Sequence, residues 1–242
     1  MALLEDLDRG LVDLIFPRDC SVTQEPLDEG PFRHLSATGA EALPRIVDPR
    51  CLTCGHPFDG WLEGDRSCPH CIELHPAFDR AICPFRAKGA VRHILHRIKY
   101  GGAPFLADDL VVVAALDETL RRHLAGSVLV PVPMHRSKEL DRGYNQADRI
   151  AQGWARAIPG CTVASLVEKH VPTESQTRLD RTMRLSNVAR CFRLSPDAQV
   201  DAGRRYVVVD DVLTTGATLH ACAQVLRAAG AAAVDAAALA HG

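Results

Sequence analysis

The sequence predicts an α/β protein in which a parallel-sheet domain follows a small cysteine-rich module. From about residue 90 onward, apolar runs typical of buried strands alternate with segments of helical periodicity. Strands that interleave with helices indicate a parallel sheet with crossover helices. Residues 46–80, in contrast, are rich in Cys, His, Pro and Gly and poor in aliphatic residues. We therefore divide the chain into an N-terminal helix and cysteine-rich segment, 1–80, and a sheet domain, 81–242.

The individual elements follow from local patterns. Apolar positions three and four residues apart predict helices, valine-rich apolar runs predict buried strands, and a polar run of Arg, Thr and Ser predicts a loop. Helices are expected at 3–15, 89–100, 105–125, 145–158 and 218–230. Strands are expected at 127–133, 162–169, 188–194, 204–211 and 232–240, with a long loop at 172–189. No internal repeat is evident in the sequence.

Composition and charge exclude several classes of protein. The 28 Lys and Arg residues nearly balance the 30 Asp and Glu residues, so the net charge of −2 favours neither nucleic acid nor a membrane surface as an obligatory partner. No apolar run approaches the ~20 residues of a membrane span. The first residues lack the basic start and small-residue cleavage site of a signal peptide, so a cytoplasmic location is expected.

Four of the nine cysteines form a pattern typical of metal ligands. Two Cys-x2-Cys pairs are separated by 13 residues (68 − 54 − 1 = 13). Each pair can present two thiolates from one tight turn, and two pairs complete a closed tetrahedral site. Structural zinc is the expected ion, and a redox pair or two disulfides are minor alternatives. The expected ligands of this zinc ribbon are Cys51, Cys54, Cys68 and Cys71.

Other histidines and cysteines lie near or beyond this pattern. His56 and His70 could each replace a thiolate, but exposed loop histidines are the simpler interpretation. Cys20 is followed by Ser-Val-Thr and so forms only half of a further pair. Small buried hydrophobic side chains are the expected role of the remaining four, Cys83, Cys161, Cys191 and Cys222.

A run of valines ends in two adjacent carboxylates, Asp210 and Asp211, and a Thr-Thr-Gly turn precedes the next helix. A parallel strand ending at the carboxyl edge of a sheet opens into the crevice where α/β proteins bind ligands. Backbone N–H groups and threonine hydroxyls at a helix start can hold a phosphate, and Gly216 permits close approach. The carboxylates could accept hydrogen bonds from sugar hydroxyls or lie near Mg²⁺. These features favour a ribose 5-phosphate site; a turn capped by Asp and Thr is the structural alternative.

The segment DDVLTTGAT at 210–218 resembles the phosphoribosyl pyrophosphate (PRPP) loop of the type I phosphoribosyltransferases. The chain also resembles the competence protein F (ComF) family in its cysteine pattern, in IKYGG at 98–102, in RGYNQ at 142–146 and in the run from Thr173 to Asn187. This resemblance extends over essentially the whole chain. It implies a zinc-binding segment joined to a phosphoribosyltransferase-like domain. Family members often have additional cysteine pairs before the ribbon, but only Cys20 stands there in this chain, so no second metal site is expected.

The resemblance also implies which residues meet the ligand. The acidic pair would contact ribose hydroxyls, and the loop after it would hold the 5-phosphate, with Mg²⁺ accompanying the PRPP. Arg136 follows the Pro-Val-Pro strand end and is the candidate for a pyrophosphate-facing loop. For Arg142 and Asn145, a ligand role and a helix-capping or packing role are both open. The complete expected set is Asp210, Asp211, Val212, Leu213, Thr214, Thr215, Gly216, Ala217, Thr218 and Arg136.

The role that the family implies is the handling of incoming single-stranded DNA in natural transformation, alongside the competence machinery. Residues 131–193 give modest support, because 11 Lys and Arg there outnumber 6 Asp and Glu (11 − 6 = +5). The same arginines could cover PRPP or simply be solvated, and aromatic residues for base stacking are scarce. The alternatives are an active Mg²⁺-dependent phosphoribosyltransferase with an unknown acceptor, and a PRPP-sensing regulator. No residue identifies a nucleophile or a base pocket.

Overall fold

The computed structural model describes residues 18–27, 30–58, 60, 66–171 and 190–242. The chain forms two compact units, Met1–Leu43 and Pro44–Gly242, so the four-cysteine segment belongs to the same unit as the sheet. The division at residue 80 that the sequence suggested stays a prediction. The helix expected at 3–15 and the loop expected at 172–189 lie outside the described residues.

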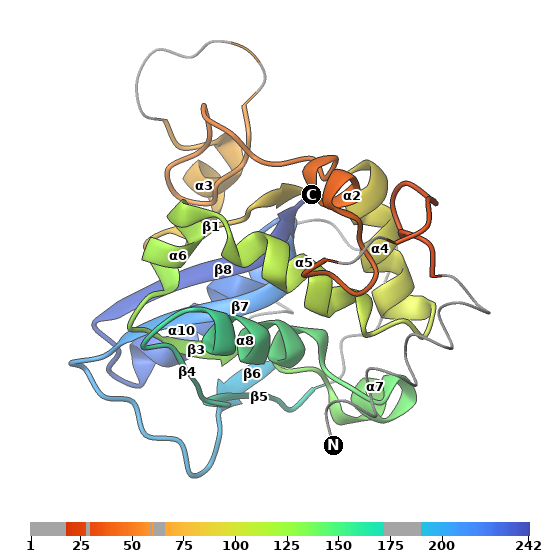
Figure 1. The fold of residues 1–242 in the computed structure, drawn as a ribbon. Coiled ribbons are helices and arrows are strands. Elements are labelled where there is room, and N and C mark those ends of the chain that lie inside the picture. The colour runs from red at the N-terminus through yellow and green to blue at the C-terminus, as the bar shows by residue number, and fades with distance from the viewer. Residues whose placement is uncertain (1–17, 28–29, 59, 61–65, 172–189) are drawn as a thin grey trace, which may run out of the picture. The chain divides into compact units, whose positions relative to one another are not determined.

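The larger unit is built on a parallel sheet whose strand order is β1-β8-β7-β3-β4, with β2 also pairing with β8 (Figure 1). A separate antiparallel pair is formed by β5 and β6. The predicted α/β fold with a parallel sheet is therefore confirmed. The sheet strands are β1 (Ala81–Ile82), β2 (Phe85–Arg86), β3 (Val128–Pro131), β4 (Thr162–Val163), β7 (Arg205–Leu213) and β8 (Ala233–His241). The separate pair is β5 (Val167–Lys169) and β6 (Phe192–Leu194).

Helices cover both faces of this sheet. On one face lie α4 (Gly89–Tyr100), α5 (Leu106–Ala115), α6 (Glu118–Leu124) and α8 (Gln146–Ala157), and on the other lies α10 (Ala217–Ala228), beside β5 and β6 (Figure 1). The valine run Val207–Val209 is fully buried between these layers, as expected for a strand covered on both sides. In the described part of the chain, no helix combines the length and the apolar character needed to cross a membrane.

Three element predictions were wrong, one because of a helix cap and two because of how the strands pair. The single helix expected at 105–125 is two helices, because Asp117 caps α6 by accepting a hydrogen bond from Leu120 N over 2.9 Å. The strand expected at 162–169 is divided between β4 and β5, which belong to different sheets. Finally, β7 does not end at Asp211 but continues to Leu213, which pairs with His241 on β8.

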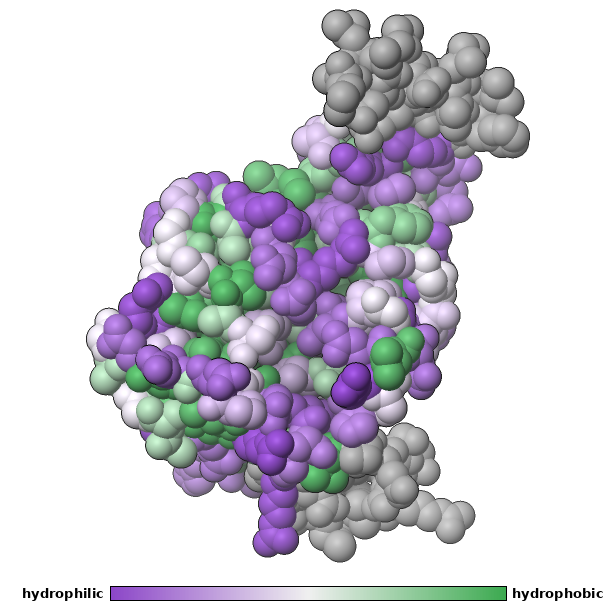
Figure 2. Space-filling view, turned by 90° about the horizontal axis from the view of Figure 1, so that it is seen from below, coloured by the Kyte–Doolittle hydropathy of each residue, from purple (hydrophilic) through white to green (hydrophobic). Residues whose placement is uncertain are grey.

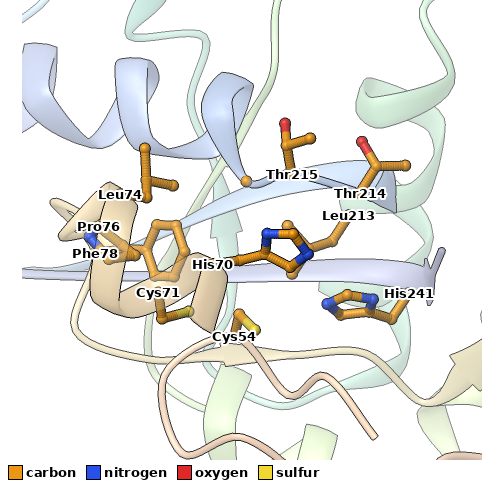
Figure 3. A pocket seen from close by; sticks show the side chains of 11 residues that line it. Cys54, His70, Cys71, Leu74, Pro76, Phe78, Leu213, Thr214, Thr215 and His241 are labelled. Atoms are coloured by element: carbon orange, nitrogen blue, oxygen red, sulfur yellow. The ribbon is translucent and has the colours of Figure 1, made fainter. Parts of the chain in front are cut away.

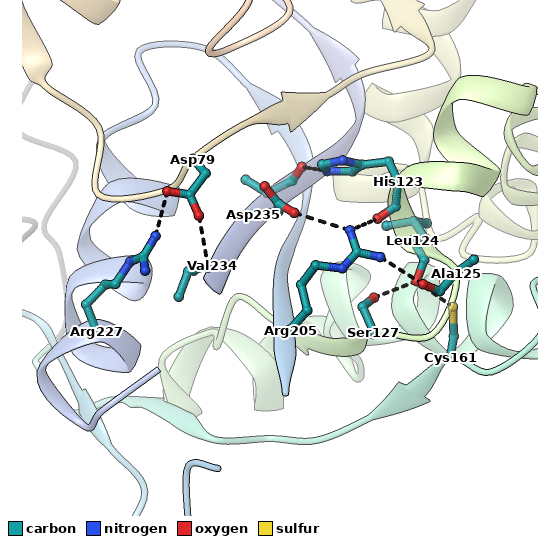
Figure 4. Close-up of polar contacts among 11 residues, drawn as sticks. Asp79, His123, Leu124, Ala125, Ser127, Cys161, Arg205, Arg227, Val234 and Asp235 are labelled. Atoms are coloured by element: carbon teal, nitrogen blue, oxygen red, sulfur yellow. Dashed lines mark hydrogen bonds and ion pairs between the residues drawn. The ribbon is translucent and has the colours of Figure 1, made fainter. Parts of the chain in front are cut away.

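Polar contacts near the amino ends of β7 and β8 tie the sheet to neighbouring segments (Figure 4). Arg205 donates to the carbonyl of His123 over 2.6 Å and pairs with Asp235 at 3.3 Å. Arg227 on α10 pairs with Asp79 at 2.6 Å. These cations and carboxylates satisfy one another and backbone carbonyls, so we assign them a structural role. The opposite, carboxyl edge of the sheet remains as the candidate for chemistry.

Candidate functional site

The four predicted cysteine ligands come together in one buried cluster, with their Sγ atoms all within 4.8 Å of one another. Sulfurs around a tetrahedral zinc ion with ~2.3 Å bonds stand ~3.8 Å apart, so this donor set fits such an ion. The backbone N–H of Cys68 donates to Cys51 Sγ over 3.2 Å. Hydrogen bonds from the Cys54 and Cys71 thiols lower the pKa of Cys51, which favours its thiolate form. The cluster could therefore hold a metal ion.

The first turn of the cluster, from Cys51 to Gly55, packs against β1 of the sheet and hydrogen-bonds to it. Gly55 has a φ of 73°, and a Cβ at this position would lie 3.1 Å from the carbonyl oxygen of Ala81 on β1. The Ala81 N–H also donates to the carbonyl of Thr53 over 2.6 Å. Only glycine combines this left-handed conformation with so close a backbone approach. The second turn leads into the short helix α3 (Pro69–Leu74), which begins after Cys68.

Predictions for the remaining histidines and cysteines were mostly correct. His70 is exposed as predicted, but His56 is half-buried, and its ring packs edge-on against His241 with 4.9 Å between centroids. His56 is half-buried because the first cysteine turn packs against the end of β8, where His241 lies. Buried thiols at Cys83, Cys191 and Cys222 confirm their role as small hydrophobic groups, whereas Cys161 is only partly buried.

The smaller unit repeats the backbone of the cysteine cluster, so the absence of a repeat in the sequence was misleading. Cys20 N–H donates to Glu25 O over 2.7 Å as Cys51 N–H donates to His56 O over 2.8 Å, an offset of 31 residues (51 − 20 = 31). The bridges Asp19–Pro26 and Arg50–Pro57 match at the same offset. Both turns also contain a left-handed residue, Gln24 with a φ of 61° and Gly55 with a φ of 73°. The repeat lies in hydrogen bonding that side-chain identity does not reveal.

Three of the four ligand positions in this repeat hold other residues. Ser36 N–H donates to Cys20 Sγ over 3.2 Å, the same length as the bond from Cys68 N–H to Cys51 Sγ. Ser36 also caps the short helix α2 (Ala37–Glu41), as Cys68 precedes α3. Thr23 and Gly39 stand at the two remaining positions. This set has one thiol, whereas a structural zinc site of this kind uses four.

Cys20 keeps the surroundings of a metal ligand without the metal-binding partners. Burial acts to raise the pKa of its thiol, but hydrogen bonds from Ser36 and Thr23 outweigh burial and lower the pKa to about 6. Backbone N–H groups directed at sulfur stabilise a thiolate, and the same arrangement is found around Cys51.

The predicted ligand loop lies at the carboxyl edge of the sheet, between β7 and α10. A pocket there is lined by Asp210 and residues 212–219. Gly216 precedes α10 with a φ of 78°, and its missing side chain leaves the first N–H groups of this 12-residue helix facing the turn. Thr214 and Thr215 are exposed beside them. Hydroxyls, helix-start amides and the positive end of the helix dipole together suit a phosphate. The first of these amides, Ala217 N–H, donates to Thr215 Oγ1 over 3.5 Å.

The two carboxylates of the acidic pair have different surroundings. Because β7 continues past them, their side chains leave the strand on opposite faces, and only Asp210 lines the pocket. Asp211 is 7% exposed and pairs with Lys99 Nζ at 2.9 Å. Burial, followed by the negative charge of Asp211, raises the pKa of Asp210 to about 7, while Lys99 and Lys169 act in the opposite direction.

The other predicted site residues lie outside this pocket. Arg136 is exposed at the first position of α7 (Arg136–Arg142) and is not part of the pocket lining within the described residues. Asn145 caps α8 by accepting from Ala147 N–H over 3.0 Å and also donates to Val132 O over 3.0 Å. Arg142 lies over the Tyr100 ring, 5.7 Å from its centroid. Capping and packing are therefore the observed roles of Asn145 and Arg142.

Leu219 lines the pocket and Lys99 pairs with Asp211 of the acidic pair, but neither was predicted as a site residue. The IKYGG segment places Lys99 in the last turn of α4, where Tyr144 of the RGYNQ segment donates to the neighbouring Ile98 carbonyl. Both segments are distinctive in the sequence. That they contact each other beside Asp211 depends on how α4 packs on the sheet, which the sequence does not reveal. Leu219 follows the predicted segment by one residue and lines the pocket from the first turn of α10.

Comparison with known proteins finds a family model, curated relatives and a solved structure that are similar to this chain. The phosphoribosyl transferase domain model matches residues 143–242. Competence protein F of Haemophilus influenzae is 26% identical over 75% of this chain and 80% of its own length. DNA utilization protein YhgH of Escherichia coli is 29% identical over 76% of this chain and 81% of its own length. A purine phosphoribosyltransferase structure from Pyrococcus horikoshii is 19% identical, with a TM-score of 0.31 over 56% of this chain and 72% of its own.

The relatives named competence protein F and DNA utilization protein YhgH confirm the resemblance to the competence protein F family. The chain has homologues named competence protein F and YhgH, and it contains a phosphoribosyl transferase domain with a parallel sheet. Its four-cysteine cluster is compatible with a small zinc-binding module.

Proposed function

We propose that this homologue of competence protein F binds PRPP, or a related ribose 5-phosphate, with Mg²⁺ at the carboxyl edge of β7. The observation that supports this most is the single pocket surface formed by Asp210 and residues 212–219. The 5-phosphate would accept hydrogen bonds from the first amides of α10 and from the Thr214 and Thr215 hydroxyls. Asp210 would accept hydrogen bonds from ribose hydroxyls, and Asp211, on the opposite face of β7, would keep its ion pair with Lys99.

The remaining parts of the proposal concern the zinc ion, the Mg²⁺ ion and the pyrophosphate group of PRPP. Zinc at Cys51, Cys54, Cys68 and Cys71 would serve a structural purpose, because four thiolates leave no open coordination position. Mg²⁺ would arrive with the PRPP rather than occupy a protein cage. Arg136, exposed at the start of α7, would meet the pyrophosphate as the loop after β3 adjusts to the ligand.

We further propose that the chain handles single-stranded DNA in the cytoplasm as part of competence-type DNA uptake or use. The names competence protein F and DNA utilization protein support this role for the present chain. Four exposed cations in the basic region support it as well: Arg136, Lys138, Arg156 and Arg190. Other members of that region are engaged, since Arg149 pairs with Asp108 and Arg193 with Glu168. Figure 2 shows one face of the molecule, on which hydrophobic residues lie in separate groups among hydrophilic ones.

Isothermal titration calorimetry with PRPP and Mg²⁺ tests the ligand. Saturable binding is expected for the zinc-loaded protein and for the control Asp197→Asn, which changes an exposed aspartate. An Asp210→Asn/Asp211→Asn variant should lose that binding. Equal binding by this variant, or no binding by the unchanged protein, would remove the ligand from the proposal.

DNA handling needs its own measurement. Fluorescence anisotropy with a labelled single-stranded oligonucleotide should show an affinity that falls steeply with added salt. The double variant Arg136→Ala/Lys138→Ala should weaken that affinity, and Arg122→Ala, a matched exposed cation on α6, should not. Salt-independent or undetectable binding would contradict the DNA role.

The phosphoribosyl transferase match favours a second candidate, a PRPP-dependent transferase with an unknown acceptor. Transfer would displace pyrophosphate from the anomeric carbon, with positioning and charge stabilisation as the main contributions. Pyrophosphate release in the presence of a panel of bases and amines distinguishes this candidate. Tight PRPP binding with neither release nor DNA binding would instead indicate a PRPP-sensing regulator.

A further inference from the structure

Residues of the cysteine cluster and of the phosphate loop line the same pocket. A second pocket is lined by Cys54, Cys71 and Leu74 and also by Thr214 to Gly216. In Figure 3, Cys54 and Cys71 lie across the pocket from Thr214 and Thr215. All of these residues belong to the unit Pro44–Gly242. The turn that receives the phosphate in the proposed function thus lines this pocket together with one thiol from each cysteine turn, Cys54 from the first and Cys71 from the second.

Leu74 makes the closest approach between the two. It follows Cys71 by one helical turn on α3, so the same face of this helix presents the thiol and the leucine. A Cβ at Gly216 would lie 3.2 Å from Leu74 Cδ2, and the φ of 78° at Gly216 already requires glycine. Any shift of α3 therefore moves Leu74 into or away from the residue at which the phosphate loop becomes α10.

The chain after α3 fixes this contact to α10 itself. Ala77 N–H donates to His220 Nδ1, one turn into α10, over 3.0 Å. Further along α10, Arg227 donates to the Ala77 carbonyl over 3.3 Å and pairs with Asp79 at 2.6 Å. Residues 74–79 are thus attached to the same helix whose first amides form the proposed phosphate site.

From these contacts we infer that Leu74 is a positioning residue for the phosphate loop, and that metal occupancy of the four cysteines is linked to PRPP affinity. Metal bound at Cys71 would hold α3 and hence Leu74 against Gly216. Without metal, four thiols in one cluster have no common partner, and α3, only six residues long, loses its anchor. The inference deepens the proposed PRPP site and rests on it.

A matched pair of substitutions on α3 tests the positioning role. Leu74→Ala opens space beside the loop, whereas Ile72→Ala changes a side chain that is 60% exposed on the same helix. With zinc content verified as unchanged, PRPP affinity by calorimetry should fall roughly 5- to 150-fold in Leu74→Ala, the usual range for coupled sites. Ile72→Ala should bind as the unchanged protein does. Equal affinities in both variants would overturn the inference.

The linkage has a second readout that does not need PRPP. Hydrogen exchange of the amides at 213–219 should quicken when zinc is removed by a chelator, while amides of β3 should keep their protection. By reciprocity, saturating PRPP should raise zinc affinity by the same factor by which zinc raises PRPP affinity.

These measurements separate two failures. If the zinc-loaded protein binds no PRPP, the proposed ligand is wrong, and the exchange experiment alone decides whether zinc orders the loop. If PRPP binds but zinc removal leaves both exchange at 213–219 and PRPP affinity unchanged, the ligand stands and the linkage is wrong.

Discussion

Asp210 is the residue whose ionisation should govern ligand binding. Its carboxyl faces the phosphate loop, and its pKa is raised to about 7 by burial and by Asp211. Only the carboxylate form accepts hydrogen bonds from both ribose hydroxyls. PRPP affinity should therefore increase between pH 6 and pH 8. A titration of PRPP with Mg²⁺ alone corrects for ionisation of the ligand itself, and an affinity that after this correction stays constant between pH 6 and pH 8 would contradict the prediction.

The same carboxyl should affect folding stability with a definite sign. Its pKa is about 7 in the folded protein against 3.8 for the ordinary group, so between these values the folded state binds more protons than the unfolded state. Stability should fall as pH rises through this window. Partial exposure reduces the effect to on the order of 1–3 kcal/mol. Urea unfolding at pH 5 and pH 8 should show a smaller fall for Asp210→Asn, and an equal fall in both proteins would argue against the shifted pKa.

Lys99 and Asp211 form the other charged contact of the site, and their interaction can be isolated. Lys99→Met leaves the carboxylate of Asp211, which is 7% exposed, without its cation at 2.9 Å. We expect a loss of roughly 1–3 kcal/mol in the free energy of unfolding. Adding Asp211→Asn should cost less than the two single effects together. Additive effects in this double-mutant cycle would mean that the ion pair contributes nothing.

At the scale of elements, sequence patterns located most segments but missed how they begin and end. Gly89–Tyr100 was predicted to the residue because its four buried apolar positions follow helical periodicity without interruption. The helix at 105–125 was predicted as one because Asp117 reads equally well as a helix residue and as a cap. The strand before the phosphate loop was predicted two residues short, because its pairing with β8 continues through Val212 and Leu213, beyond the two carboxylates.

The candidate site was predictable where it is local and unpredictable where distant segments meet. The segment 210–218 announces itself by composition, and eight of its nine residues, all but Asp211, line the pocket. The contact of Lys99 with Asp211, the packing of Leu74 on Gly216 and the repeat around Cys20 all depend on tertiary arrangement. Periodicity and spacing contain no information about these pairs.

The repeat around Cys20 makes an element-scale prediction. Replacing the three non-thiol positions, Thr23→Cys/Ser36→Cys/Gly39→Cys, should create a second four-thiolate site, provided that Cys20 Sγ moves aside from position 39, where a Cβ would lie 2.5 Å away. The measurement is zinc per chain by elemental analysis, with Thr23→Cys alone as the control. One additional zinc ion is expected for the triple variant only, and unchanged zinc content in a folded triple variant would contradict the equivalence of the two backbones.

At the scale of the whole molecule, the proposed activity depends on the larger unit as one body. The sheet holds Asp210 and the loop, α4 supplies the Lys99 partner of Asp211, and two residues of the cysteine cluster line a pocket together with the loop. Amino-edge contacts such as Arg205 with Asp235 keep the strands in register at the far end. The proposed phosphate loop is thus the place where the sheet, α10 and the cysteine cluster meet.

The most direct test of this account is a crystal structure of the protein grown with PRPP and Mg²⁺. We expect the 5-phosphate at the start of α10, hydrogen-bonded to amides of residues 215–218, with the ribose hydroxyls beside Asp210. A 5-phosphate bound elsewhere, or a loop at 214–218 that stays empty beside saturating PRPP, would contradict the central claim.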